Sequence, residues 1–417
     1  SAVAGNSITI PDFFSNRFRE DKKVLMTISA LFILVFFTVY AASCFVTCGK
    51  LFSTLFGLDY HMMMVAGALF VICYTFLGGF LAESTSDFMQ SVIMVIALAT
   101  ILIGGVMAAG GIERVVSNIQ NIPGFFTFFG IAQPEVSNGI QQVSSAGVPL
   151  FGEAKEYGIL TIISTVSWGL GYFGVPQVLL RFMAIRKADE LKKSRRIATV
   201  WCIFSLIAAV SIGLIGRALY PTALLTASSS ENIFIVMATK LLPPLGAGLV
   251  MAGILAATIS SSDSYLLIAA SAFSKNIYQG LIKKNATEKQ IMRVSRITLI
   301  LVALFGMFIA LDENSVIFTV VAFAWAGFGA TFGPIMLFSL FWKRTTKQAA
   351  VAGMLSGGIS VFIWKLLLKP LGGIFGIYEL LPAFIISCIF IVVVSLLTEE
   401  PSKEIQEDFE NAKTFKC

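Results

Sequence analysis

The sequence predicts an all-α polytopic membrane protein with about ten transmembrane helices. Three observations support this class. Hydrophobic residues make up 57% of the chain and charged residues 13%, with a mean hydropathy of +0.85, whereas soluble domains carry about 25% charged residues. Apolar stretches long enough to cross a bilayer recur along the chain. Lysine and arginine gather in alternate loops between these stretches, as in α-helical membrane proteins.

The predicted elements follow one another with mostly short connections. Residues 1–23 form a polar, basic lead-in to a transmembrane domain that covers 24–397, and an acidic, polar tail occupies 398–417. The segment 111–157 is rich in Gly, Pro, Asn and Ser and is predicted to be a loop with room for a short helix. A short amphipathic surface helix is predicted at 231–242. The spans are predicted at 24–50, 61–80, 86–110, 158–185, 195–216, 249–274, 291–311, 316–342, 349–368 and 380–397.

The basic residues predict the orientation of the chain. They cluster after the fourth, sixth and eighth spans, whereas the intervening loops are poor in Lys and Arg. Because cytoplasmic loops carry the excess of positive charge, the pattern places both ends of the chain in the cytoplasm and 111–157 outside. The basic residues are Arg186, Lys187, Lys192, Lys193, Arg195 and Arg196, then Lys275, Lys283, Lys284, Lys289, Arg293 and Arg296, then Lys343, Arg344 and Lys347.

A polar cluster interrupts the sixth span. The apolar run from 244 to 274 would extend roughly 45 Å as a helix, and a hydrocarbon core is about 30 Å thick, so the cluster falls near the midplane. Polar residues at that depth indicate a face that meets a cavity or a cation. The alternative is that the hydroxyls pack neighbouring helices or bond to their own carbonyls. One helical face is shared by Ala257, Ser260, Ser261 and Ser264, with Asp263 at its edge.

The fourth span contains SWGLGYFGVPQ, in which three glycines and Pro176 interrupt the apolar residues. This pattern indicates a discontinuous helix, which in secondary transporters exposes backbone groups to substrate; a simple kink is the alternative. Trp168 and Tyr172 lie one turn apart, so both rings can pack around a small, partly apolar zwitterion. Tyr40 supplies another such ring at membrane depth. Aromatic residues in this pattern also occur in ordinary cores.

Asp87 lies near the start of the third span. A carboxylate in that position is either solvated at the membrane surface or supplies a charged oxygen ligand for a hard cation beside the hydroxyl-rich helix. The residues alone leave both interpretations open.

The composition argues against an enzyme. The single histidine, His61, excludes the usual His-based triads and metal sites, and no glycine-rich phosphate-binding turn is present in the sequence. All cysteines except the terminal Cys417 lie in apolar stretches without a CxxC pair, so no structural disulfide is predicted. The basic runs abut membrane spans and lack interleaved aromatics, so no nucleic-acid partner is predicted.

The chain resembles the sodium:solute symporter family, and within it bacterial sodium/proline symporters, through SWGLGYFGVPQVLLRFMAI, ILAATISSSDSYLLIAASA, FAWAGFGATFGPIMLFSLFWKRTTKQAAVAGMLSGG and ITIPDFFSNRF. The similarity covers nearly the whole chain and is weakest in 111–157. It implies an inverted five-plus-five helix repeat in which the extra N-terminal helix and the first two core helices are absent from this chain. We therefore expect a piece of a longer protein, with a naturally split transporter as the alternative.

The resemblance also implies site residues. The sodium site of the family matches Ala257, Ser260 and Ser261, and an aspartate at the start of the fifth core helix matches Asp87. A second sodium site of some relatives matches Asp263 and Ser264. Val175 departs from the glutamine expected at its position, which alters the pocket or only its wall. The residues associated with proline recognition match Tyr40, Trp168, Tyr172 and Pro176.

These features together predict sodium-coupled uptake of a small amino acid, above all L-proline, by alternating access across a bacterial plasma membrane. Sodium is the predicted coupling ion, and no cofactor is expected. One alternative is a sodium symporter for another small solute, such as pantothenate or another carboxylate. The other alternative is a non-transporting membrane sensor or partner fragment.

Overall fold

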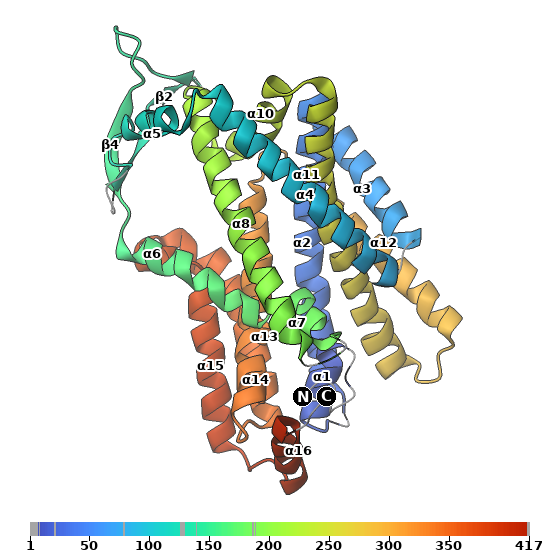
Figure 1. Cartoon of the computed structure of the whole chain (residues 1–417). Coiled ribbons are helices and arrows are strands. Elements are labelled where there is room, and N and C mark those ends of the chain that lie inside the picture. The colour runs from blue at the N-terminus through green and yellow to red at the C-terminus, as the bar shows by residue number, and fades with distance from the viewer. Residues whose placement is uncertain are drawn as a thin grey trace.

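The computed structural model describes residues 7, 9–20, 22–77, 80–125, 130–138, 140–185, 187 and 189–414. Long helices run side by side through most of the molecule (Figure 1). Helices α1 (Ile10–Arg17) and α16 (Lys403–Thr414) lie at the lower end of that view, which is named here the terminal end. Four short strands lie at the opposite end, which is named the hairpin end.

Eight helices of the described chain are long and apolar enough to cross a membrane, and a bent pair makes a ninth span. The predicted span 61–80 corresponds to α3 (Tyr60–Leu77), an apolar helix of 18 residues that rises about 27 Å. The spanning helices are α2 (Val24–Phe56), α4 (Phe80–Ala108), α8 (Glu190–Leu219), α11 (Pro244–Ser271), α12 (Glu288–Ile309), α13 (Ile317–Phe341), α14 (Lys347–Ile363) and α15 (Leu380–Leu397). The bent pair is α6 (Ile159–Val166) with η1 (Ser167–Phe173), followed by α7 (Pro176–Met183).

Two of the long helices change their hydrogen-bonding pattern at one end. The π-helix η2 (Ala272–Ile282) continues α11, so the hydroxyl-rich helix is longer than its predicted range of 249–274. The π-helix η3 (Trp364–Leu368) continues α14 and leads into the 3-10 turns η4 (Lys369–Leu371) and η5 (Gly373–Gly376).

Helix α2 lies in the middle of the bundle and contacts α3, α11, α12 and α13. Its fully buried Phe36 and Phe37 pack on α13 and α11, with the Phe36 ring 5.6 Å from Phe328 and the Phe37 ring 5.4 Å from Tyr265. A Cβ at Gly327 would lie 2.1 Å from the Phe36 ring, so only glycine permits this approach. Close contact of this kind positions helices in lipid, where burying apolar groups between helices contributes little. Helix α2 therefore fixes α11 and α13 relative to one another.

The segment 111–157 departs from the prediction of an all-α chain. It contains α5 (Ile112–Gln120), and then β1 (Gly130–Pro134) pairs antiparallel with β4 (Phe151–Glu156), and β2 (Val136–Ser137) with β3 (Ile140–Gln141). The prediction of a loop missed the dipeptide Asn138–Gly139, which is a strong hairpin signal between short alternating stretches. Asn138 has the positive φ, 52°, that such a turn requires.

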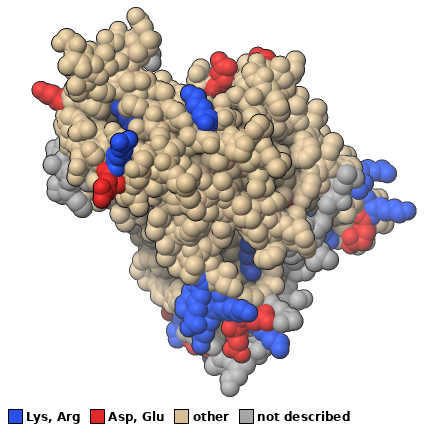
Figure 2. Space-filling model, turned by 45° about the horizontal axis from the view of Figure 1, so that its top comes forward, with Lys and Arg blue, Asp and Glu red and all other residues tan. Residues whose placement is uncertain are grey.

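The polar segments outside the spans are also folded. Helix α1 buries Phe13 and Phe14, so the lead-in 1–23 contributes to the core. The predicted helix at 231–242 is present as α10 (Ile233–Leu241), after the short α9 (Ala227–Ser230). On the face shown in Figure 2, charged side chains stand mainly near the margins, and a broad uncharged surface lies between them. This surface suits contact with lipid.

Candidate functional site

The predicted break in the fourth span is present, and the two helices that flank it are bent by 40°. Pro176 occupies the first turn of α7, where its missing N–H costs no hydrogen bond. The break lies directly against α13. A Cβ at Gly171 would lie 1.9 Å from Trp325 Nε1, and a Cβ at Gly174 would lie 2.5 Å from Gly333 N. The glycines therefore allow backbone contact between the broken helix and α13.

Trp168 belongs to a group of stacked rings. Its ring centroid lies 5.2 Å from Phe318, 5.4 Å from Trp325 and 5.8 Å from Tyr378. Trp325 Nε1 donates a hydrogen bond to Trp168 O at 3.0 Å, and Tyr172 meets Trp325 edge-on at 4.8 Å. The structure thus brings Trp168 and Tyr172 to one partner, Trp325. Tyr172 stays 46% exposed, which leaves it accessible to a ligand.

Tyr40 packs on α11. Its ring stacks on Tyr265 with centroids 4.2 Å apart and planes 20° apart. The Tyr265 hydroxyl interacts with the hydroxyls of Tyr40 and Ser261. Tyr265 therefore joins a residue predicted to contact substrate, Tyr40, to one predicted to bind sodium, Ser261.

Three serines of the polar cluster, Ser260, Ser262 and Ser264, bond back to their own helix, as the alternative interpretation of the cluster predicts. Ser261 differs from them because its hydroxyl interacts with Tyr265. Carbonyl and hydroxyl oxygens nevertheless lie within one turn at Ala257, Ser260 and Ser261, and such oxygens suit a hard cation. The back-bonds run from Ser260 Oγ to Ala257 O at 3.2 Å, from Ser262 Oγ to Thr258 O at 2.8 Å and from Ser264 Oγ to Ser260 O at 3.1 Å.

The two acidic candidates have different surroundings. Asp263 is 1% exposed, and its Oδ1 accepts a hydrogen bond from Ser264 N at 2.7 Å. Asp87 forms an ion pair with Arg181 of α7, with Arg181 Nη2 2.5 Å from Asp87 Oδ2. The other oxygen of Asp87, Oδ1, is buried without a hydrogen-bond partner in the described chain. The Asp87 side chain is only 12% exposed. This exposure does not fit the interpretation of Asp87 as a solvated carboxylate at the membrane surface.

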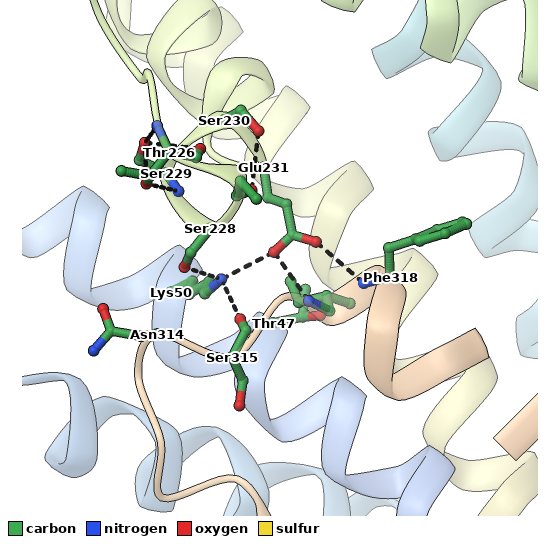
Figure 3. Close-up of polar contacts among 12 residues, drawn as sticks. Thr47, Lys50, Thr226, Ser228, Ser229, Ser230, Glu231, Asn314, Ser315 and Phe318 are labelled. Atoms are coloured by element: carbon green, nitrogen blue, oxygen red, sulfur yellow. Dashed lines mark hydrogen bonds and ion pairs between the residues drawn. The ribbon is translucent and has the colours of Figure 1, made fainter. Parts of the chain in front are cut away.

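Another ion pair, between Lys50 and Glu231, lies at the hairpin end (Figure 3). Lys50 of α2 donates to Glu231 Oε2 at 2.9 Å, to Ser228 Oγ at 2.9 Å and to Ser315 O at 2.7 Å. Glu231 in turn accepts from the first backbone N–H groups of α13, at Ile317 and at Phe318, each at 3.1 Å. This network ties α2, the α9–α10 segment and the start of α13 together.

The comparisons with known proteins agree with these features. A model described as "Sodium:solute symporter family" matches residues 3–357. The chain belongs to the sodium:solute symporter family. Relatives named "Sodium/proline symporter" in Staphylococcus aureus, and in its strains USA300 and Newman, are 40% identical to this chain. The alignments cover 99% of this chain and 77% of each relative. The chain is also similar to the structure "Substrate-bound outward-open state of a Na+-coupled sialic acid symporter reveals a novel Na+-site". The match has a TM-score of 0.69 at 18% identity and covers 95% of this chain and 78% of the chain in that structure.

Membership of the family confirms several predictions. The protein is a sodium-coupled symporter with a multi-pass helical fold, and it is not an enzyme.

Within the described residues, no group of three His, Cys, Asp or Glu side chains could hold a metal ion. The oxygen donors of α11 suit sodium better than they suit a transition metal.

Sequence reasoning missed several residues around the candidate site. Trp325, Phe318 and Tyr378 contact Trp168 but lie about 150 to 210 residues further along the chain, so no local spacing connects them to it. Tyr265 could have been found, because it lies four residues after Ser261 on the predicted helical face.

Proposed function

We propose that this symporter takes up L-proline with sodium across the bacterial plasma membrane, with its terminal end in the cytoplasm. The link from Tyr40 through Tyr265 to Ser261 carries this proposal, because it joins substrate-binding and sodium-binding residues through one buried ring. The relatives named sodium/proline symporter support proline as the substrate. Helices α1 and α16 lie at the same end of the bundle, which supports both termini on one side of the membrane. The basic loops support the cytoplasm as that side.

Each candidate residue has a distinct role in this proposal. Ala257 O and the hydroxyls of Ser260 and Ser261 bind sodium, and Asp87 supplies a further oxygen. Asp263 and Ser264 supply oxygens at the position of the second sodium site. Binding replaces the back-bonds within α11 by bonds to the cation. On the substrate side, Trp168, Tyr172 and Tyr40 surround the pyrrolidine ring and its ammonium group. Pro176 shapes the start of α7 next to them.

Coupling then follows from linkage. Sodium that binds better to the outward-facing state raises the population of the state that accepts proline, and proline raises sodium affinity by the same factor. The transmembrane potential drives the cycle, because one charge that crosses 100 mV gains about 2.3 kcal/mol.

Uptake of labelled proline into proteoliposomes tests the substrate. An inward sodium gradient is expected to drive accumulation, and collapse of the gradient should abolish it. Unlabelled proline should compete, whereas pantothenate and other small carboxylates should not. Competition by pantothenate with no competition by proline would replace proline by another solute of the same family.

Ser261→Ala tests the sodium site. The variant should raise the sodium concentration for half-maximal uptake about tenfold, equivalent to about 1.4 kcal/mol, and leave proline affinity at saturating sodium nearly unchanged. Ser262→Ala is the matched control, because Ser262 is fully buried and its hydroxyl donates to Thr258 O and Ile259 O of its own helix. Equal sodium dependence in both variants would remove Ser261 from the site.

Trp168→Ala tests the substrate side. Loss of its ring should raise the half-saturating proline concentration about tenfold or more, since aromatic packing and cation–π contact each contribute about 1 kcal/mol. Trp201→Ala on the exposed side of α8 is the control for loss of an indole. An unchanged half-saturation for proline would contradict the role given to Trp168.

A further inference from the structure

A cavity of about 400 Å³ lies at the hairpin end, away from the broken helix. Its walls come from three parts of the chain: the β-containing segment, the last turns of α8, and the segment from Tyr220 to Ile233. Aromatic rings contribute much of the lining, at Phe125, Phe151 and Tyr220. The volume lies in the range of small-molecule sites, which is about 300–1,000 Å³.

Arg217 provides the only charged side chain among the described residues that line this cavity. Its Nη2 donates to Gln141 Oε1 at 3.0 Å, and its guanidinium carbon lies 5.7 Å from the centre of the Phe151 ring. Gln141 is itself 2% exposed and donates through Nε2 to Leu150 O at 2.9 Å. A buried amide that is fixed at both ends therefore orients the guanidinium.

Most donors of this guanidinium remain free. An arginine side chain carries five N–H donors, and Arg217 makes one hydrogen bond to the described chain. Its other nitrogens are not among the buried atoms that lack a partner in the described residues, so they face accessible space. Two adjacent N–H groups of a guanidinium match the two oxygens of a carboxylate.

The charge of the lining discriminates between ligands. A bound carboxylate can pair with Arg217, whereas the described lining residues include no acidic side chain that could pair with the ammonium group of an amino acid. Two of the three rings already face cations, since Arg217 lies over Phe151 and Lys240 Nζ lies 5.0 Å from the centre of the Tyr220 ring. A monoanion with an apolar body fits this lining better than a zwitterion does.

We propose that this cavity binds small monocarboxylates with an apolar body, at a site separate from the one that binds the transported solute. Arg217 pairs with the carboxylate, Gln141 positions Arg217, and the aromatic rings cover the apolar body. A ligand here contacts the β-containing segment, α8 and the 220–233 segment together. Binding therefore holds these three parts of the hairpin end in one arrangement.

Equilibrium binding of labelled benzoate to the purified, detergent-solubilised protein tests this site. Benzoate should bind saturably without sodium, and neutral benzamide should not compete with it. Arg217→Gln should weaken binding about tenfold or more, because the charged guanidinium bonds the carboxylate more strongly than a neutral amide does. Saturable binding that Arg217→Gln and Gly213→Leu both leave unchanged would overturn the proposal, as would the absence of saturable binding to the wild type.

Gly213→Leu keeps Arg217 and fills the cavity instead. Gly213 lines the cavity, and a Cβ at this position meets nothing within 4 Å, so a side chain can begin here without a clash. Benzoate binding should be lost in this variant. Gly248→Leu in α11 is the matched control, because a Cβ there also meets nothing within 4 Å and Gly248 does not line the cavity. The control should bind benzoate as the wild type does.

Excess proline separates this proposal from the proposed function. Proline should not displace benzoate, because the two ligands occupy different sites; displacement would overturn the second site. If proline is not transported but benzoate binding depends on Arg217 and Gly213, the carboxylate site stands and the proposed substrate fails.

Discussion

Two ion pairs join distant parts of the chain: Lys50 with Glu231 at the hairpin end, and Asp87 of α4 with Arg181 of α7. The two pairs differ in how many of their polar atoms have hydrogen-bond partners. Lys50 and Glu231 are 7% and 19% exposed, and their charged groups share five hydrogen bonds across three segments. Asp87 and Arg181 are 12% and 56% exposed, and Asp87 Oδ1 is buried without a partner in the described chain.

This difference separates a fixed contact from an exchangeable one. A buried charge that loses its partner costs about 3–5 kcal/mol, so the Lys50–Glu231 contact is expected to persist. An ion pair with one exposed member contributes about 0–1 kcal/mol because water and salt screen it. Asp87 can therefore exchange Arg181 for a cation at little cost, as its proposed role toward sodium requires.

The largest effect is expected from Glu231→Ala. The substitution leaves Lys50 Nζ buried opposite an apolar side chain and removes the acceptor from Ile317 N and Phe318 N. The free energy of unfolding should fall by about 3–5 kcal/mol, measured by denaturant titration in detergent micelles.

The control for Glu231→Ala is the double variant Lys50→Met with Glu231→Gln. It leaves no unpaired charge, and the side-chain amide that replaces the carboxylate can still accept a hydrogen bond from the start of α13. Most of the stability should return. If Glu231→Ala is as stable as the wild type, the Lys50–Glu231 pair is no more fixed than the Asp87–Arg181 pair.

The next largest effect is expected from Asp87→Asn, which should change the sodium dependence of uptake more than the free energy of unfolding. Loss of the half-exposed pair should change the free energy of unfolding by about 1 kcal/mol or less. The sodium concentration for half-maximal proline uptake should rise about tenfold. Glu113→Gln on the exposed face of α5 controls for a surface carboxylate. An unchanged sodium dependence would exclude Asp87 from the sodium pathway.

Some of these contacts could be predicted from the sequence, and others could not. Hydropathy predicted the helices, because membrane helices follow local composition. Spacing predicted only that the Trp168 and Tyr172 rings can face one cavity, not that they share a partner. The partner itself, Trp325, depends on how α13 packs on the broken helix, and a contact of that kind has no local signature. Lys50 with Glu231 was missed for the same reason, since 181 residues separate them.

The coupling energy between the members of each pair should show the same contrast. Double-mutant cycles should give several kcal/mol for Lys50 with Glu231 and less than about 1 kcal/mol for Asp87 with Arg181. Added choline chloride should reduce only the second value, because salt screens exposed charges much more than buried ones. Equal salt sensitivity in both cycles would argue that the Lys50–Glu231 pair is hydrated.

The smallest effect is expected from Arg17→Met in α1. Arg17 Nη1 and Nη2 are buried without hydrogen-bond partners in the described chain, and burial lowers the pKa of Arg17 to about 10. The charge therefore opposes folding below pH 10, and this cost fades as the pH rises through 10. Its contact with the Phe409 ring at 4.9 Å offsets part of the cost. Arg17→Met should thus change the free energy of unfolding by less than about 1 kcal/mol at neutral pH.

Arg19→Met, which removes exposed ion pairs to Glu404 and Asp408, is the control and should cause a small loss of stability that added salt masks. A loss for Arg17→Met as large as that for Glu231→Ala would mean that the terminal end also depends on a fixed charge.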